Sequence, residues 1–168
     1  SQKEDRGKEL TGTISLSGAF ALYPLAVKWA DEFQKMNPDV TIDLSAGGAG
    51  KGITDVLAGQ VDLGMVSREL KGAEIQQGAL GFAVAKDAVV PTINIRNPVY
   101  KELLKKGFSI KAAKGLWITA TVKTWGQVTG TTNNISKVNV YPRSDACGTA
   151  ATFAKWLGKD QEDFKGTG

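Results

Sequence analysis

The chain has 168 residues, 42% of them hydrophobic and 23% charged, which is enough apolar material for one domain or two small lobes. It has no histidine and one cysteine, Cys147, so a Ser-His-Asp triad, a Cys-His pair, a histidine-ligated metal and an internal disulfide are all excluded. The formal net charge of +4 is compatible with binding of small anions. The sequence has none of the Lys/Arg blocks that are typical of nucleic-acid binding.

The first ten residues predict a solvated tether. Segment 1–10 carries three basic and three acidic residues and little that a core could bury. It has no apolar run of the kind found in secretory signals, so such a signal is either absent or already removed. No other apolar run is long enough to span a bilayer.

Three strands alternating with two helices are predicted in the first half of the chain. The strands are the β-branched or alternating segments 11–16, 40–44 and 61–66, each followed by Gly or Ser. Two such strand-helix-strand units imply right-handed crossovers and a parallel sheet. The predicted fold class is therefore α/β, and its ligands are expected beyond the carboxyl ends of the strands.

The helices of that half show clear start and stop signals. Pro24 suits a first helical position, and Leu25, Trp29 and Phe33 recur on one face. A shorter helix follows the second strand and closes at Gly59.

The second half predicts a further set of elements. Segment 80–95 reads as two buried strands broken near residues 86–87, so we place one lobe at 11–88 and a second at 89–168. A helix is predicted from residue 97 to Gly107, a strand at 138–140, and a helix after the loop 141–149.

The glycine-rich loop 45–52 follows the second strand and suggests an anion-binding turn. It fails the Walker A pattern, because Gly52 follows Lys51 where Ser or Thr is needed, and it also fails the dinucleotide fingerprint. A glycine-dense turn before a helix still brings backbone N–H groups toward an anion. The alternative is that the glycines only allow close packing of helix and strand.

Two further loops have side chains suited to an oxyanion. Arg143 supplies a planar fork that Asp145 is placed to orient, and Ser67 with Arg68 closes the third strand. The alternatives are an ordinary helix cap and a solvated surface arginine. Cys147 as a nucleophile lacks a histidine base, and an inert buried thiol is the more economical interpretation.

In their order, these segments resemble the PstS-like phosphate-binding proteins of ABC transporters, a branch of the type II solute-binding family. The matching pieces run from residue 15 to residue 158: SLSGAFALYPLAVKWADEF, SAGGAGKGI, VDLGMVSREL, AVVPTINI, the region of Trp125 before Thr129-Gly130, and YPRSDACGTAATFAKWLG. The resemblance implies two lobes with mainly parallel sheets and an anion held between them. Family members are longer, so we expect the second lobe and the C-terminal return to be incomplete here.

The resemblance also implies which residues bind the ligand. They are residues of the first strand-helix turn, the Gly/Ser loop, the third strand's end and the Arg143 loop, namely Ala19, Phe20, Ala21, Ala49, Gly50, Ser67, Arg68, Arg143, Asp145, Cys147, Gly148 and Thr149. The chain departs from the family where Ala19–Ala21 and Ala49-Gly50 lack hydroxyls and where Cys147 replaces a serine.

The function implied by the resemblance is that of an extracytoplasmic protein, not an enzyme, that captures phosphate for an ABC importer. Its partners would be phosphate or a similar oxyanion and a transporter permease, with a lipid anchor before Ser1 left open, and no cofactor, metal or nucleic acid is expected. The alternatives are another tetrahedral oxyanion such as sulfate or molybdate, a sensor of the same fold, and a hydrolase of phosphate esters that uses Cys147.

Overall fold

The structure of the chain, a computed structural model, describes residues 10–131 and 133–166. The tether expected at 1–10 therefore lies outside the described residues except for Leu10. The chain divides into two compact units, and each is treated by itself. Unit 1 comprises the described residues up to Lys86 together with Asp145–Gly148, and unit 2 comprises Asp87–Ser144 and the described residues from Thr149 onward.

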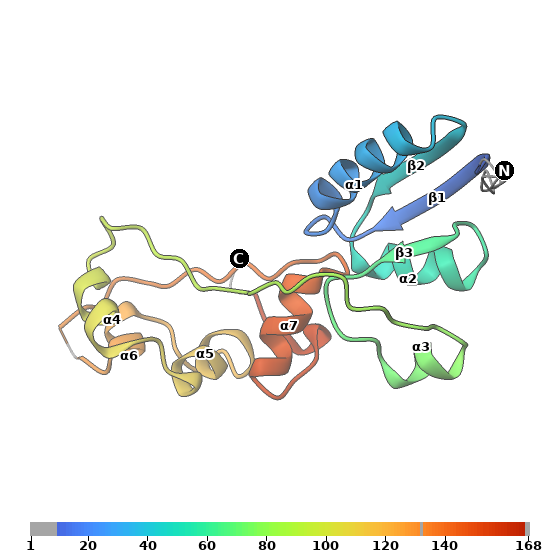
Figure 1. Cartoon of the computed structure of the whole chain (residues 1–168). Coiled ribbons are helices and arrows are strands. Elements are labelled where there is room, and N and C mark those ends of the chain that lie inside the picture. Colours follow the sequence, from blue (N-terminus) through green and yellow to red (C-terminus); the bar gives the residue numbers. More distant parts are fainter. Residues whose placement is uncertain (1–9, 132, 167–168) are drawn as a thin grey trace, which may run out of the picture. The chain divides into compact units, whose positions relative to one another are not determined.

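Unit 1 is built on a parallel three-stranded sheet. The strands are β1 (Gly12–Gly18), β2 (Val40–Ala46) and β3 (Leu63–Met65), in the order β2-β1-β3. In the register of the sheet Leu16 lies opposite Leu44 on one side and Leu63 on the other. The three predicted strands and the parallel α/β class are thus confirmed (Figure 1).

The helices of unit 1 cover this sheet. Helix α1 (Tyr23–Met36) packs against β2, and α2 (Ala49–Leu57) packs against β1 and β3. A short helix, α3 (Gly72–Gln76), follows the last strand. The cluster at the centre contains Ala19, Ala26, Ala49 and Met65.

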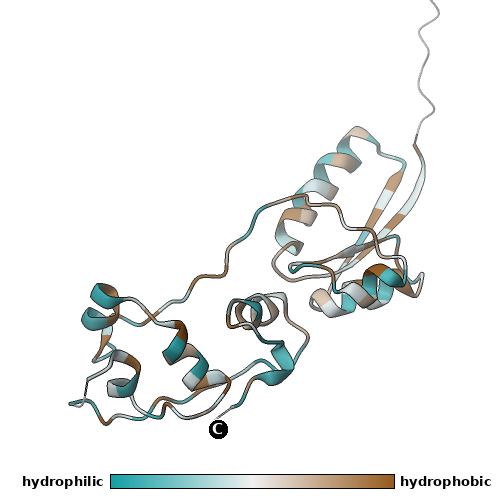
Figure 2. Ribbon diagram, turned by 90° about the horizontal axis from the view of Figure 1, so that it is seen from below, coloured by the Kyte–Doolittle hydropathy of each residue, from teal (hydrophilic) through white to brown (hydrophobic). Residues whose placement is uncertain are grey.

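Helix α1 turns a different face to the sheet than its pattern of large residues suggested. Its buried residues are Ala26 and Ala30, whereas Leu25 and Trp29 are 39% and 45% exposed. Small side chains allow the helix axis to approach β2 closely, which the larger pair would prevent. Figure 2 shows both hydrophobic and hydrophilic residues along this helix.

Unit 2 is helical and irregular over its described residues. Its helices are α4 (Tyr100–Lys106), α5 (Ile110–Trp117), α6 (Trp125–Thr129) and α7 (Gly148–Trp156), followed by the 3-10 turn η1 (Gln161–Asp163). Helix α7 starts in unit 1, at Gly148. The predicted end of the first of these helices at Gly107 is confirmed, because Gly107 is its C-cap residue.

Two predictions for this half are wrong. Segment 80–95 forms no strand, and its side chains are largely exposed, with Leu80 83% and Phe82 81% exposed. Val138 and Val140 are buried but belong to no strand; a single antiparallel bridge joins Thr124 to Lys137 beside them. A segment with alternating apolar residues forms a strand only where an adjacent strand pairs with its backbone amides and carbonyls, and no such strand is found beside these segments among the described residues.

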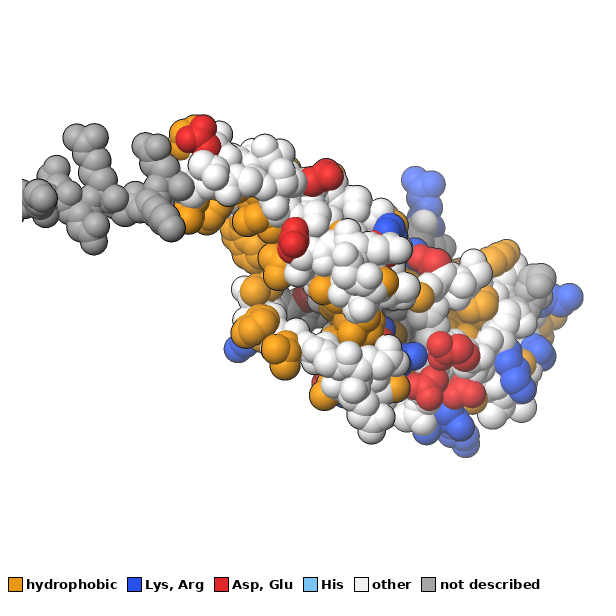
Figure 3. Space-filling view, turned by 90° about the vertical axis from the view of Figure 1, so that its right-hand side faces the viewer, with side chains coloured by type: hydrophobic (Ala, Val, Ile, Leu, Met, Phe, Trp, Pro, Cys, Tyr) orange, Lys and Arg blue, Asp and Glu red, His pale blue; other side chains and the backbone are white. Residues whose placement is uncertain are grey.

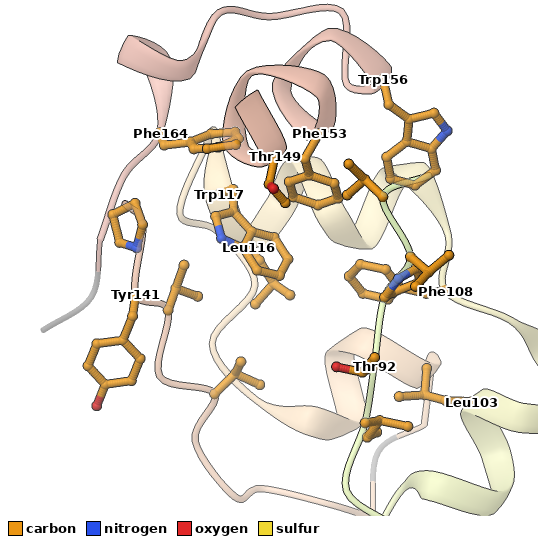
Figure 4. A pocket seen from close by; sticks show the side chains of 18 of the residues that line it. Thr92, Leu103, Phe108, Leu116, Trp117, Tyr141, Thr149, Phe153, Trp156 and Phe164 are labelled. Atoms are coloured by element: carbon orange, nitrogen blue, oxygen red, sulfur yellow. The ribbon is translucent and has the colours of Figure 1, made fainter. Parts of the chain in front are cut away.

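A large apolar cavity lies within unit 2. It has a volume of about 1100 Å³ and is lined by extended segments near residues 89–93 and 138–143 and by helix residues. Figure 4 shows Phe108, Trp117, Phe153 and Phe164 around it. Edge-to-face contacts order part of this lining, with ring centroids 6.1 Å apart for Phe108 and Trp117 and 5.1 Å for Trp117 and Phe153.

The surface mixes charge signs. The face in Figure 3 carries Lys and Arg side chains beside Asp and Glu side chains, with hydrophobic side chains between them. Over the described residues, the structure contains no helix that is both long enough and apolar enough to cross a membrane.

A glycine in α2 tests the close packing of unit 1. A Cβ on Gly52 would lie 2.5 Å from the Met65 carbonyl oxygen and 2.9 Å from that of Ser17, so the backbone would have to move. We expect Gly52→Ala to lower the free energy of unfolding by about 1–3 kcal/mol in urea denaturation. Gly72→Ala is the control, since its Cβ would meet nothing within 4 Å; equal stability of the two variants would contradict this packing.

Candidate functional site

The carboxyl ends of all three strands meet at one edge of the unit 1 sheet. The amides of Gly47 and Gly48 donate to the Gly18 carbonyl at 2.9 and 3.0 Å, which joins the end of β2 to the end of β1. The Ala19 amide donates to the Met65 carbonyl at 2.8 Å, which joins β1 to β3. The three predicted loops therefore form one cluster.

The segment 145–148 packs into the same cluster although it is distant in sequence. The Gly50 amide lies 3.5 Å from the Ala146 carbonyl oxygen, a long contact. A Cβ on Gly148 would clash with the Ser67 hydroxyl and lie 2.6 Å from the Ser67 carbonyl oxygen. Only glycine permits so close an approach, so Gly148 places the start of α7 directly against Ser67.

Several backbone amides of this edge are available to a ligand. Within the described residues, the N–H groups of Phe20, Ala21 and Ala49 donate to no protein acceptor. Ala49 is the first residue of α2, where the positive end of the helix dipole favours a negative charge. The Ala19 amide is not available, because it is committed to Met65.

The structure places the remaining predicted residues as follows. Ser67 is partly buried beside Gly148, and Cys147, the only cysteine, is buried in unit 1. Asp145 belongs to the same segment, while Arg143 and Thr149 flank it and belong to unit 2. The Arg143 carbonyl accepts a hydrogen bond from Gln161 at 3.4 Å within unit 2.

Arg68, predicted as a ligand residue, is paired with a carboxylate in unit 1. Its guanidinium forms a two-pronged pair with Glu74, with nitrogen-oxygen distances of 2.9 and 2.7 Å. The sequence pattern could not show this partner, since Glu74 reaches Arg68 only because α3 folds back on the loop. The hydrogen bond from Arg68 lowers the pKa of the Glu74 carboxyl, as do, to a smaller extent, the Lys71 amide and nearby charges.

A polar network around the buried side chains of Ser17 and Asp55 links β1 to α2 next to the cluster. Ser17 is fully buried at the end of β1 and donates to Asp55 of α2 at 2.6 Å. Lys51, one helical turn before Asp55, donates to the same carboxylate. The hydrogen bonds from Lys51 and Ser17 lower the pKa of Asp55 and outweigh the opposing effect of burial.

A second carboxylate, that of Asp62, links the residues just before β3 to β1. Asp62 accepts hydrogen bonds from the backbone amide and the hydroxyl of Ser15, both at 2.8 Å. These bonds lower the pKa of Asp62. The Lys51-Asp55 spacing of four residues is a helix-pair signal that was readable in the sequence, whereas the Ser15-Asp62 contact had no local signal.

The site has the chemistry of an anion cradle. It offers backbone N–H groups, one hydroxyl and a helix start, and the described residues contain no group of side chains that could hold a metal ion. The comparison with protein families agrees with this architecture, since residues 5–168 match the model described as the PBP superfamily domain. The chain belongs to the PBP superfamily.

Individual relatives within the PBP superfamily sharpen the comparison. The chain is 31% identical over 171 residues to the phosphate-binding protein PstS of Bacillus subtilis, a match that covers 96% of this chain and 51% of the relative. The chain spans about half the length of the curated relatives it matches.

Solved structures show the same likeness. A Clostridium perfringens substrate-binding protein crystallised with bound phosphate superposes with a TM-score of 0.74 at 27% identity, covering 92% of this chain and 59% of that protein. An ABC-type phosphate transport receptor from Vibrio cholerae gives a TM-score of 0.68 at 21% identity, covering 91% and 60%, and supports the fold. The predicted resemblance is confirmed.

The buried network predicts a pH-dependent contribution to stability. Because the pKa of Asp55 is lowered in the folded chain, its contribution is complete above its ordinary pKa and is lost as the pH falls through the lowered value. We expect Asp55→Asn to be less stable than the parent at about pH 7, with the difference shrinking toward about pH 2.

Urea unfolding across this pH range measures the effect. Asp43→Asn, at an exposed position of β2, is the matched control. A difference for Asp55→Asn that stayed constant with pH would contradict the assignment.

Proposed function

We propose that this chain is part of a protein that binds inorganic phosphate and delivers it to an ABC importer outside the cytoplasm. The observation that carries the proposal is that three strand ends and the segment 145–148 converge on one edge of the sheet. Several backbone amides at this edge donate to no protein acceptor. The names of the relatives from Bacillus subtilis and Clostridium perfringens support phosphate as the ligand.

The proposed ligand groups are of two kinds. Neutral donors are the amides of Phe20, Ala21, Ala49 and Gly148 and the hydroxyl of Ser67, since fixed dipoles stabilise an anion without a counter-charge. The second kind comes from the flanking residues, where Arg143 provides a cation suited to bidentate oxyanion contact, Asp145 orients it and Thr149 adds a hydroxyl. Cys147 is proposed to contribute its backbone amide, whereas the Gly50 amide already makes a long contact with the Ala146 carbonyl at 3.5 Å.

Binding without covalent chemistry fits the residue types. The chain has no histidine, and the relatives are named as binding proteins. Phosphate at neutral pH carries one or two negative charges and both donates and accepts hydrogen bonds, so a hydroxyl such as that of Ser67 serves either form. A transporter permease is the proposed protein partner, and a periplasmic or cell-surface location follows from that partnership.

Substitutions of Arg143 and Ser67 compare the contribution of the proposed cation with that of the proposed hydroxyl. Loss of a charge-assisted contact costs about 1.5–3 kcal/mol and loss of a neutral one about 1 kcal/mol. We therefore expect Arg143→Ala to weaken phosphate binding about 10-fold to 100-fold and Ser67→Ala about fivefold, measured by isothermal titration calorimetry. Equal affinities for the two variants would count against the proposed roles.

The second prediction concerns which anion is bound. A ligand that binds only the folded state stabilises it by about 2.7 kcal/mol at a concentration of 100 times its Kd. Phosphate and arsenate, which share shape and protonation, are expected to raise the melting temperature more than sulfate or molybdate. A larger shift with sulfate or molybdate would reassign the ligand, and no shift with any of the four anions would refute anion binding.

A further inference from the structure

The loop that carries Ser67 is held by a largely buried ion pair between Arg68 and Glu74. The side chains of Arg68 and Glu74 are only 12% and 13% exposed. Both terminal nitrogens of Arg68 bind Glu74, at 2.9 and 2.7 Å, in the parallel geometry that makes such pairs strong and directional.

Each end of the pair also binds the backbone. Arg68 donates to the Glu69 carbonyl at 2.8 Å, and Glu74 accepts the Lys71 amide at 2.7 Å. The guanidinium and the carboxylate therefore connect the residues after Ser67 to the first turn of α3 through four hydrogen bonds. A helix of only five residues has little stability of its own, so this pair adds to the backbone hydrogen bonds that hold it.

The charge pattern argues against a direct role for Arg68 at the anion. Within the described part of unit 1, two basic side chains near the strand ends are paired with carboxylates, Lys51 with Asp55 and Arg68 with Glu74. The donors proposed for the anion at this edge of unit 1 are neutral amides and the Ser67 hydroxyl. By simple charge the Glu74 carboxylate disfavours a nearby anion, whereas a positioning role favours its binding, so removal of this charge distinguishes the two effects.

We propose that Arg68 and Glu74 are positioning residues that hold the Ser67 hydroxyl against Gly148 for contact with the anion. This inference rests on the proposed function. Arg68 acts through the neighbouring Ser67 and does not touch the ligand, and Glu74 keeps the guanidinium turned toward α3.

The decisive variant is Glu74→Gln, which keeps the size of the side chain and removes its charge. Coulombic repulsion alone predicts tighter phosphate binding, whereas loss of positioning predicts binding about threefold to fivefold weaker by calorimetry, bounded by the loss expected for Ser67→Ala. Arg68→Lys, which retains the charge but not the planar fork, is expected to weaken binding similarly. Glu32→Gln, in an exposed pair with Lys35 on α1, controls for the change of net charge and should leave affinity unchanged.

A double-mutant cycle separates positioning from general destabilisation. If the pair acts through Ser67, Glu74→Gln weakens binding in the parent but has little further effect in the Ser67→Ala background. Tighter binding by Glu74→Gln, or an equal loss in both backgrounds, would overturn the proposal.

Hydrogen exchange makes the test independent of phosphate. We expect the amides of residues 66–69 to exchange faster in Glu74→Gln than in the parent, with β1 unchanged. If these amides exchange faster in Glu74→Gln but the parent binds no phosphate, the proposed function is refuted and the effect of the pair on the loop stands. Unchanged exchange at 66–69 would refute the positioning role whatever the parent binds.

Discussion

The close contact between the three strand ends of the unit 1 sheet is the constraint on which the candidate site depends. Parallel strands bring their carboxyl ends to one edge, and each loop that leaves this edge must pass its neighbours. The Gly18 carbonyl accepts two amides from the β2 loop, and the Met65 carbonyl accepts the Ala19 amide. These bonds fix the loops at a spacing that leaves the adjacent amides pointing to no protein acceptor.

Charged side chains near this edge are paired with one another. The buried Asp55 accepts hydrogen bonds from the buried Ser17 and from the more exposed Lys51, and Glu74 pairs with Arg68, so the carboxylates neutralise the nearest cations. A site made of neutral dipoles binds an anion through directed hydrogen bonds, which favours shape and protonation state over net charge as the basis of selection.

Two apolar segments show what happens when a strand-like sequence has no neighbouring strand. Segment 80–95, which crosses from unit 1 into unit 2, and residues 138–140 have the composition of strands, yet neither forms a ladder among the described residues. A cavity of about 1100 Å³ with aromatic lining lies between extended segments of unit 2. Strand propensity describes a fit to a pleated, half-buried surface, so it cannot produce a strand without neighbouring strands.

Much of unit 1 was determined by the sequence itself. Local periodicity and glycine placement were sufficient for β1, α1, β2 and α2, and the alternation of strands and helices was sufficient for the parallel sheet and for the edge at which the strand ends converge. The roles of Arg68 and of the α1 surface were decided only by the tertiary structure. The pairing of Arg68 with Glu74 depends on how α3 folds against the preceding loop, and the exposure of Trp29 depends on how closely Ala26 and Ala30 approach β2. Such contacts arise from packing between elements, which a linear pattern does not encode.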